Sequence, residues 1–254
     1  MASVEKLYFP SHQRKLLDPY LPDPHGPLPE WRPWITLTYA SSLDSKISAG
    51  PGKQTVLSGS ASKAMTHYLR TKHDGILVGS GTAITDNPGL NSRLGDAIDA
   101  QDRLALQPRP IILDRRARWT PQGSKTVELC RDGRGKSVVV FRGFPSENPS
   151  GLREHGNHGG DGFDYYPYVE FSKMLSTLKS IGIDSIMIEG GATIINSILS
   201  DHVHLIDSVI ITYAPVYLGE GGVSVSPSGP LAKLDKVSWL TMEDDAVMCA
   251  VPKR

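Results

Sequence analysis

Short apolar runs alternate with helical stripes through the middle of this sequence, and the alternation limits the possible folds more than any other feature. Runs rich in Val, Ile and Leu occupy residues 76–78, 110–114, 138–141 and 185–188, a composition typical of strands buried on both faces. Apolar residues recur at helical spacing in the segments between several of these runs. Strands joined by helices form parallel sheets, so the pattern predicts an α/β fold with a mainly parallel central sheet and helices on both faces.

The two ends of the folded region differ from its middle. Residues 34–40 are rich in β-branched and aromatic side chains and predict the first strand. Residues 207–214, 237–241 and 246–251 predict three strands with no helical stripe between them. We therefore expect antiparallel strands late in the chain, within one domain over residues 34–254.

Two helix boundaries have sequence signals. Ser60 precedes the helical stripe that begins at Ala61 and is the expected N-cap. Gly182 follows the stripe that ends at Ile181 and is the expected residue just beyond the helix.

Two segments lack these patterns. Residues 1–33 contain seven prolines, which resist helix and internal strand. We expect an extended arm that lies on the body of the protein or on a partner, and the alternative is a disordered tail. Residues 142–163 are glycine-rich and predict a flexible loop.

Composition excludes several functional classes. Lys plus Arg equals Asp plus Glu at 27 each, so the chain lacks the basic excess of a general nucleic-acid binder. Two distant cysteines, Cys130 and Cys249, suit neither a zinc site nor a disulfide framework. We expect no metal, no membrane segment and no signal peptide, and hence a cytoplasmic protein.

Three polar or glycine-rich clusters follow predicted strands, where open α/β sheets bind ligands. In the first, Asp44 and Lys46 are two residues apart and would point the same way in an extended segment. One could hydrogen-bond a substrate while the other holds a phosphate. The alternative is a solvated turn.

The second cluster runs from Gly79 to Arg93. Thr82 and Asp86 are four residues apart and share a face if a helical turn forms there. Arg93 offers a planar fork for phosphate or carboxylate. A strand-to-turn joint that binds nothing remains the alternative.

The third cluster begins at Glu189, where a strand ends, Gly190 and Gly191 turn the chain, and a helix begins. The free N–H groups and dipole of such a helix start favour a pyrophosphate. The ordinary GxGxxG fingerprint is absent, and a tight turn without a ligand is the alternative.

Basic residues outside these clusters are less distinctive. Arg70 either compensates a helix dipole or reaches into the site, and His67 is expected on the helix surface. The basic run at residues 115–118 is expected to be a solvated turn. Arg142 follows a predicted strand and is a candidate to bind the 2′-phosphate of a dinucleotide.

Together, the segments SLDSKI, HYLRTKHDGILVGSGTAITDNPGLNSR, RPIILD, IMIEGGATIINSIL and ITYAPVYLG resemble the reductase family of riboflavin biosynthesis. The resemblance covers about residues 32–251. It implies a fold similar to dihydrofolate reductase and action on 2,5-diamino-6-ribosylamino-4(3H)-pyrimidinone 5′-phosphate. The zinc-deaminase signatures HxE and PCxxC are absent, so the chain resembles the single-domain form found in fungi and archaea.

The resemblance also implies NADPH, a homodimer and a set of site residues. The implied cofactor contacts are Thr82, Asp86, Val169, Gly190, Gly191, Ala192, Thr193 and Ile194. The implied substrate contacts are Lys46, Arg70, Leu90, Arg93 and Glu189, with a further residue near Gln54 or Thr55. Asp44 and Glu189 are the candidates for a catalytic proton donor.

The implied reaction is hydride transfer to C1′ of the ring-opened ribosylamine, which gives a ribitylamino product. Two alternatives remain open: an NADPH-dependent pterin or dihydrofolate reductase on the same fold, and a catalytically inactive binding protein. Dihydrofolate turnover would favour the first, and failure to bind any nicotinamide cofactor would favour the second.

Overall fold

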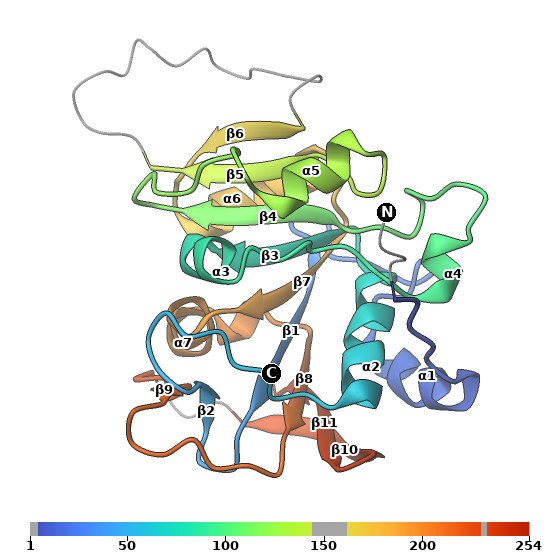
Figure 1. The fold of residues 1–254 in the computed structure, drawn as a ribbon. Helices are drawn as coiled ribbons and strands as arrows, with labels where there is room; N and C mark the ends of the chain where they lie inside the picture. The colour runs from blue at the N-terminus through green and yellow to red at the C-terminus, as the bar shows by residue number, and fades with distance from the viewer. Residues whose placement is uncertain (1–4, 144–161, 230–232, 254) are drawn as a thin grey trace.

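The computed structural model describes residues 5–143, 162–229 and 233–253 of this chain (Figure 1). These residues form a nine-stranded sheet with a pair of short strands beside it. In spatial order, the strands of the large sheet are β10 (Leu234–Met242), β11 (Asp245–Pro252), β8 (Ser208–Tyr213), β1 (Trp34–Ser41), β7 (Ser185–Gly190), β3 (Gly75–Gly79), β4 (Arg109–Asp114), β5 (Val138–Arg142) and β6 (Phe163–Pro167). The short pair is β2 (Lys46–Ser48) and β9 (Val223–Ser224).

The large sheet is mainly parallel. Each pairing from β8 through β1, β7, β3, β4 and β5 to β6 is parallel. Only β11 and β10, the last two strands, run antiparallel to their neighbours. The predicted α/β fold class, with antiparallel strands late in the chain, is confirmed.

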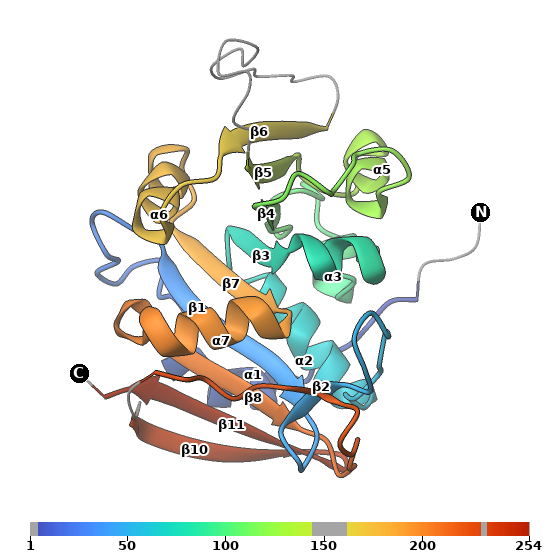
Figure 2. The same cartoon turned by 90° about the vertical axis from the view of Figure 1, so that its left-hand side faces the viewer.

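Helices cover both faces of this sheet (Figure 2). They are α1 (Ser11–Leu17), α2 (Ser60–Arg70), α3 (Ser80–Thr85), α4 (Gly95–Ile98), α5 (Lys125–Arg131), α6 (Phe171–Ser180) and α7 (Ala192–Asp201), with 3-10 turns η1 (Asp18–Tyr20) and η3 (Val203–Leu205). Leu77 of β3 shares a core cluster with Leu175 of α6, whereas Ile76 clusters with Val127 of α5. Successive side chains of a strand point to opposite faces, so α6 and α7 cover one face while α1, α2 and α5 cover the other.

The N-terminal arm lies on the body of the protein from residue 5 onward. Phe9 and Leu17 are fully buried, and the Phe9 ring lies 5.4 Å from that of Tyr68 on α2. The prediction of an extended arm is wrong for α1. Its prolines flank the helix rather than interrupt it, because Pro10 is the N-cap of α1 and Pro19 lies in the first turn of η1.

The start of α2 also differs from the prediction. Gly59 is the N-cap, and Ser60 is the first helical residue. The Ser60 hydroxyl donates to the Glu243 carboxylate at 2.8 Å, and Glu243 also accepts the Ala61 amide at 3.3 Å. A distant carboxylate therefore caps this helix in place of a local hydroxyl. At the end of α6, Gly182 adopts a φ of +78° just beyond the helix, as predicted.

Several boundaries were not predicted. β10 and β11 are longer than expected, and β6 was missed. β6 pairs only with β5 at the edge of the sheet, where Pro167 is tolerated because no ladder needs its missing N–H. Most of the predicted flexible loop, residues 144–161, lies outside the described residues, and the ends of that range, Arg142 and Phe163, are strand residues.

Candidate active site

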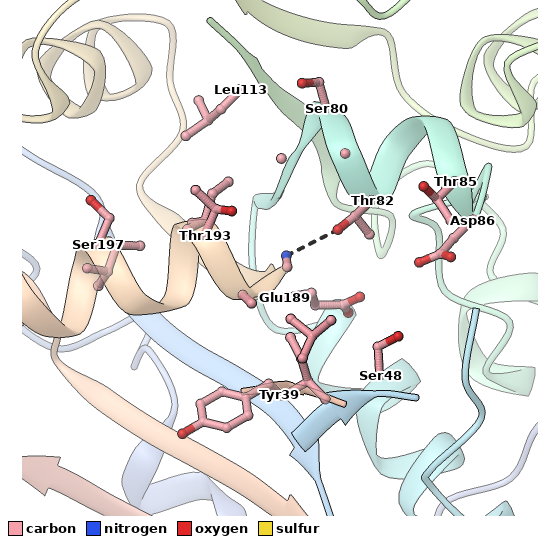
Figure 3. Close-up of a pocket in the computed structure, with 18 of the residues that line it drawn as sticks. Tyr39, Ser48, Ser80, Thr82, Thr85, Asp86, Leu113, Glu189, Thr193 and Ser197 are labelled. Atoms are coloured by element: carbon pink, nitrogen blue, oxygen red, sulfur yellow. Dashed lines mark hydrogen bonds between the residues drawn. The ribbon is translucent and has the colours of Figure 1, made fainter. Parts of the chain in front are cut away.

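A cleft of about 1300 Å³ opens at the carboxyl ends of the parallel strands. It is lined by Tyr39 of β1, Gly79 of β3 and Glu189 of β7, and also by Leu113 near the end of β4. Figure 3 shows side chains from these strand ends around one space. Ligand pockets usually measure about 300–1,000 Å³, so this cleft has room for two small molecules at once.

The joint between β7 and α7 brings backbone to the cleft. Gly190 adopts a φ of +99°, and a Cβ there would lie 2.6 Å from Ile195 Cδ1, so the position requires glycine. Gly190 itself is buried behind the surface. The cleft is lined by Gly191, Ala192, Thr193 and Ile194. The first amides of a helix have no intrahelical acceptor, so the start of α7 faces the cleft with its donors and the positive end of its dipole.

The joint between β3 and α3 meets the first joint directly. Thr82 Oγ1 accepts the Gly191 N–H at 3.1 Å, the dashed line in Figure 3. The Asp86 amide donates to the Thr82 carbonyl at 3.0 Å, so a helical turn places both residues on the cleft side, as their spacing predicted. Burial raises the pKa of the Asp86 carboxyl.

An ion pair crosses the cleft from α2 to β7. Arg70 donates from Nε and Nη2 to the two carboxylate oxygens of Glu189, at 2.8 and 2.7 Å. Its third nitrogen donates to the Asn91 carbonyl at 3.0 Å. The two side chains are only 13% and 18% exposed. This bidentate geometry fixes both predicted substrate residues in one orientation.

Two further predicted substrate residues do not line the cleft. Leu90 is buried, with a φ of +49°. Arg93 lies behind His67, whose Nδ1 accepts the Arg93 backbone N–H at 2.9 Å. His67 lines the cleft and is buried, so its expected place on the helix surface is wrong. Burial, together with the charges of Arg70 and Arg93, lowers the pKa of His67 to about 2.

Asp44 and Lys46 also lie outside the cleft lining. The segment is not extended, because Ser45 adopts a φ of +58° in a turn. Asp44 accepts hydrogen bonds from the Ser42 hydroxyl and from the amides of residues 218 and 219, and these bonds lower its pKa to about 2. Lys46 donates to a hydroxyl of β9 at 2.5 Å. The structure therefore gives both side chains structural partners and does not bring them to the other site residues.

The remaining predicted positions do line the cleft. Val169, just before α6, forms part of one wall. Gln54 and Thr55 lie in a stretch, residues 50–58, that borders the opposite end. Their placement agrees with the predicted contacts, and the contacts themselves remain predictions.

Three lining residues were missed by sequence reasoning. Arg115, Arg116 and Arg118 are exposed, line the cleft beyond β4, and form no ion pair with any described residue. Arg142, the residue predicted to read a 2′-phosphate, does not line the cleft and instead stacks over the Tyr165 ring at 5.1 Å. Ligands bind at the carboxyl ends of parallel strands, and these three arginines directly follow β4. That position could have identified them from the sequence.

Two features are absent from the described part of the chain. No group of three or more His, Cys, Asp or Glu side chains there is arranged to hold a metal ion. No helix there is long and apolar enough to cross a membrane.

The chain thus combines a mainly parallel sheet with a large cleft at its strand ends. This chain belongs to the RibD C-terminal domain family, which matches residues 33–248. The resemblance seen in the sequence is therefore confirmed at the level of the family.

The relatives define the family member more narrowly. The chain is 41% identical over 244 residues to the 2,5-diamino-6-ribosylamino-4(3H)-pyrimidinone 5′-phosphate reductase of Debaryomyces hansenii, covering 93% of this chain and 95% of that protein. It is 42% identical over 236 residues to the protein of the same name from Candida glabrata, covering 91% and 93%. The solved structure of the riboflavin biosynthesis reductase of Saccharomyces cerevisiae matches with a TM-score of 0.76 at 36% identity, covering 96% of this chain and 100% of that chain.

Proposed function

We propose that this chain uses NADPH to reduce the ribosylamino group of 2,5-diamino-6-ribosylamino-4(3H)-pyrimidinone 5′-phosphate to a ribitylamino group. The names and matching lengths of the fungal relatives support the substrate. One structural observation carries the proposal: a single cleft joins the backbone-lined start of α7 to the charged pair Arg70–Glu189.

The residues at the start of α7 fit a dinucleotide. Helix starts attract phosphate through free N–H groups and the helix dipole, and a Cβ on Gly191 would lie 2.9 Å from Thr82 Oγ1, so glycine keeps this approach open. The residues that would hold the cofactor are Thr82, Asp86, Val169 and the run Gly191, Ala192, Thr193, Ile194. When bound, the reduced nicotinamide supplies a hydride.

The exposed arginines favour NADPH over NADH. Arg115, Arg116 and Arg118 lie beyond β4, next to the strands that flank the α7 start. A 2′-phosphate is an anion of the kind that guanidinium forks bind by paired hydrogen bonds. We expect Arg115→Ala and Arg118→Ala each to reduce the ratio of kcat/KM for NADPH to that for NADH by roughly tenfold. Arg134→Ala, at an exposed arginine outside the cleft lining, is the matched control.

The residues at the substrate end orient the substrate and do not activate it by acid or base catalysis. Imine reduction depends on alignment of the reacting atoms more than on a strong base. In the reaction, the hydride adds to C1′ of the ring-opened imine and a proton adds to its nitrogen. Both Glu189 oxygens already accept from Arg70, and Asp44 lies outside the cleft lining, so we assign the proton to solvent. Arg70 and Glu189 then hold the sugar and base in place.

We also propose that the protein is a cytoplasmic homodimer. β10 is an edge strand of the sheet, and two of its apolar side chains, Val237 and Trp239, are 45% and 60% exposed. Exposed apolar side chains on an unpaired edge favour association. Sizing chromatography of the wild type should give a dimer, and Trp239→Ser should shift it toward monomer. A monomeric wild type would contradict this part of the proposal.

The function is tested by mixing the purified protein, NADPH and enzymatically prepared substrate without oxygen. We expect loss of NADPH absorbance and a product heavier by two hydrogens on the sugar. Dihydrofolate in place of the substrate is the control, because its turnover would favour the alternative reductase. Failure to consume NADPH with either compound, despite tight cofactor binding, would reject the proposed substrate.

A further inference from the structure

The chain turns sharply after β4, and residues 114–119, here called the arginine turn, carry the three arginines that line the cleft. The Ala117 N–H donates to the Asp114 carbonyl at 3.0 Å, and Ala117 has a φ of +52°. A residue with a Cβ rarely adopts a positive φ, because the Cβ crowds the backbone. Contacts with the rest of the protein therefore have to hold the turn in this shape.

The side chain of Asp114 joins the two ends of the arginine turn. Asp114 is fully buried, and its Oδ2 accepts the Trp119 N–H at 2.8 Å. Trp119 is also buried, and its ring lies edge-on to that of Phe163 on β6 with the centroids 6.5 Å apart. The other carboxyl oxygen of Asp114, Oδ1, has no hydrogen-bond partner among the described residues. Burying a carboxyl group with one oxygen unpaired costs free energy, and such costs concentrate at functional sites.

The side chain of Arg142 supports the turn from the neighbouring strand. Arg142 at the end of β5 is the register partner of Asp114 in the parallel pair of β4 and β5. Its guanidinium lies over the Tyr165 ring at 5.1 Å, and its Nη2 donates to the Ala117 carbonyl at 3.3 Å. Stacking on the ring orients the guanidinium, so its hydrogen bond reaches the residue of the turn that has the positive φ.

The backbone of Gly143 fits against the start of the turn. Its N–H donates to the Asp114 carbonyl at 3.1 Å, and a Cβ at this position would overlap the Arg115 carbonyl oxygen. Only glycine allows so close an approach. The end of β5 therefore fixes the arginine turn at two points, through the side chain of Arg142 and the backbone of Gly143.

We propose that Asp114 and Arg142 are positioning residues for the choice of cofactor, because they hold the turn in the shape that directs Arg115, Arg116 and Arg118 to the cleft. The proposal rests on the preference for NADPH proposed above. Ordering a long side chain on binding costs conformational entropy. A turn that is fixed before the cofactor arrives lowers this cost. Recognition of the 2′-phosphate then depends on two residues outside the cleft lining, and Arg142 acts through the turn instead of contacting the phosphate.

The dissociation constants of NADPH and NADH, measured by fluorescence titration of the full chain, test this role without requiring turnover. NADH lacks the 2′-phosphate, so a residue that acts through the arginine turn should change only the constant for NADPH. Arg142→Met should raise the Kd of NADPH by about fivefold and change that of NADH by less than about twofold. Arg142→Lys should recover part of the loss, because its ammonium can still donate to the Ala117 carbonyl.

Variants of Asp114 test the other support of the turn. Asp114→Ala removes the acceptor of the Trp119 N–H and should raise the Kd of NADPH by about tenfold. Asp114→Asn keeps an acceptor and should bind NADPH nearly as the wild type does. If Asp114→Ala does not fold, as its melting curve would show, the two variants of Arg142 decide the question.

Arg109→Met is the matched control for destabilisation of the same strand. Arg109 begins β4 and pairs with Asp164 of β6, outside the cleft lining. Its loss removes an ion pair of a half-buried arginine without touching the turn. The ratio of the two dissociation constants should therefore stay at the wild-type value.

A double-mutant cycle separates positioning from direct contact with the cofactor. In a chain whose three turn arginines are replaced by alanine, Arg142→Met should change the Kd of NADPH by less than about twofold, because no cation is left to position. A fivefold loss in that background would show that Arg142 acts on the cofactor itself and would overturn its positioning role.

The outcomes also separate this proposal from the function. An unchanged Kd of NADPH in Arg142→Met, or equal losses for NADPH and NADH, overturns the positioning role even if the enzyme reduces its proposed substrate with NADPH. A wild type that binds NADPH and NADH equally rejects both this role and the proposed cofactor preference. Loss of the preference in the variants, without turnover of the pyrimidinone phosphate, would support the role and reject the substrate.

Discussion

The two ends of the cleft are built from different material. At the proposed cofactor end, the joints β3–α3 and β7–α7 present backbone amides and a threonine hydroxyl, and the Gly191 N–H donates directly to that hydroxyl of Thr82. At the proposed substrate end, long charged side chains from α2, β7 and the N-terminal arm neutralise one another, as Arg70 and Glu189 do. Backbone can be placed only by the fold, whereas charged side chains can exchange partners when a ligand arrives. The cofactor end should therefore tolerate no added bulk, and the substrate end should respond to charge.

The largest effect is expected at Gly190. Gly190→Ala introduces a side chain at a φ of +99° and against Ile195, so it should weaken NADPH binding by roughly 100-fold through strain and overpacking. Fluorescence titration of NADPH measures this. Gly95→Ala is the control, because a Cβ there meets only an ordinary contact at 3.7 Å.

The melting temperature of Gly190→Ala must be measured alongside, since a misfolded variant would be uninformative. Gly191→Ala provides the second test, with its Cβ against Thr82. Unchanged NADPH affinity in both folded variants would show that backbone approach does not build the cofactor end.

A smaller effect is expected when the Arg70–Glu189 ion pair is broken, and it should be confined to the proposed substrate end. Glu189→Gln leaves the partly buried Arg70 guanidinium without its counter-charge, and should lower kcat/KM for the substrate by roughly 30-fold. The dissociation constant of NADPH should change little. Equal losses for substrate and cofactor would mean that the two ends are not separable.

A hydroxyl at the cofactor end should have a modest role. Thr82→Val removes the acceptor of the Gly191 N–H and should weaken NADPH binding by about fivefold, as for one neutral hydrogen bond. Thr82→Ser keeps the acceptor and should bind NADPH almost as the wild type does. Identical NADPH affinities of Thr82→Val and Thr82→Ser would show that the hydroxyl has no role in cofactor binding.

A separate effect concerns stability in acid rather than binding. Burial lowers the pKa of His73 to about 4, with Nδ1 donating to the Leu69 carbonyl on α2, and burial beside Arg70, Arg93 and Lys63 lowers that of His67 to about 2. Both histidines have a folded pKa below the unfolded value of about 6.5, so below pH 6.5 the unfolded chain binds protons that the folded chain does not. Their contribution to the free energy of unfolding is therefore fully present above pH 6.5 and is lost as the pH falls below it.

Native-state hydrogen exchange can locate this loss. The free energy of opening for α2 should fall between pH 7 and pH 5 by about 2 kcal/mol for each of the two histidines that opening exposes, while that for α7 should change less. A uniform fall in both helices would contradict the assignment of the acid response to the substrate end.

The sequence predicted the placement of the proposed cofactor residues in the cleft better than that of the proposed substrate residues, for a physical reason. Gly190, Gly191 and Thr82 follow buried strands, and a strand followed by glycine and a helix places backbone at a sheet edge whatever the rest of the chain does. No such local sequence pattern fixes where the charged side chains of the cleft lie. The structure places Arg93 behind His67 and outside the cleft lining, so its predicted contact with the substrate stays a prediction. The arginines after β4 were expected to form a solvated turn, but they line the cleft.

The segment from Asp44 to Lys46 shows the limit of spacing arguments. Asp44 and Lys46 are two residues apart, so their side chains point the same way only if the backbone between them is extended. Ser45 instead adopts a positive φ and turns the chain. The contact of Glu5 with Lys63 joins residues 58 apart in the chain. No periodic pattern contains such a contact, because it depends on how the arm packs over α2.

The central claim, that both ends serve one hydride transfer, is tested most directly with NADPH carrying deuterium at both C4 positions of the nicotinamide. We expect one deuterium in the product, on C1′ of the ribityl chain, with the second added hydrogen drawn from solvent. A product without deuterium, or with deuterium on the pyrimidine ring, would contradict it.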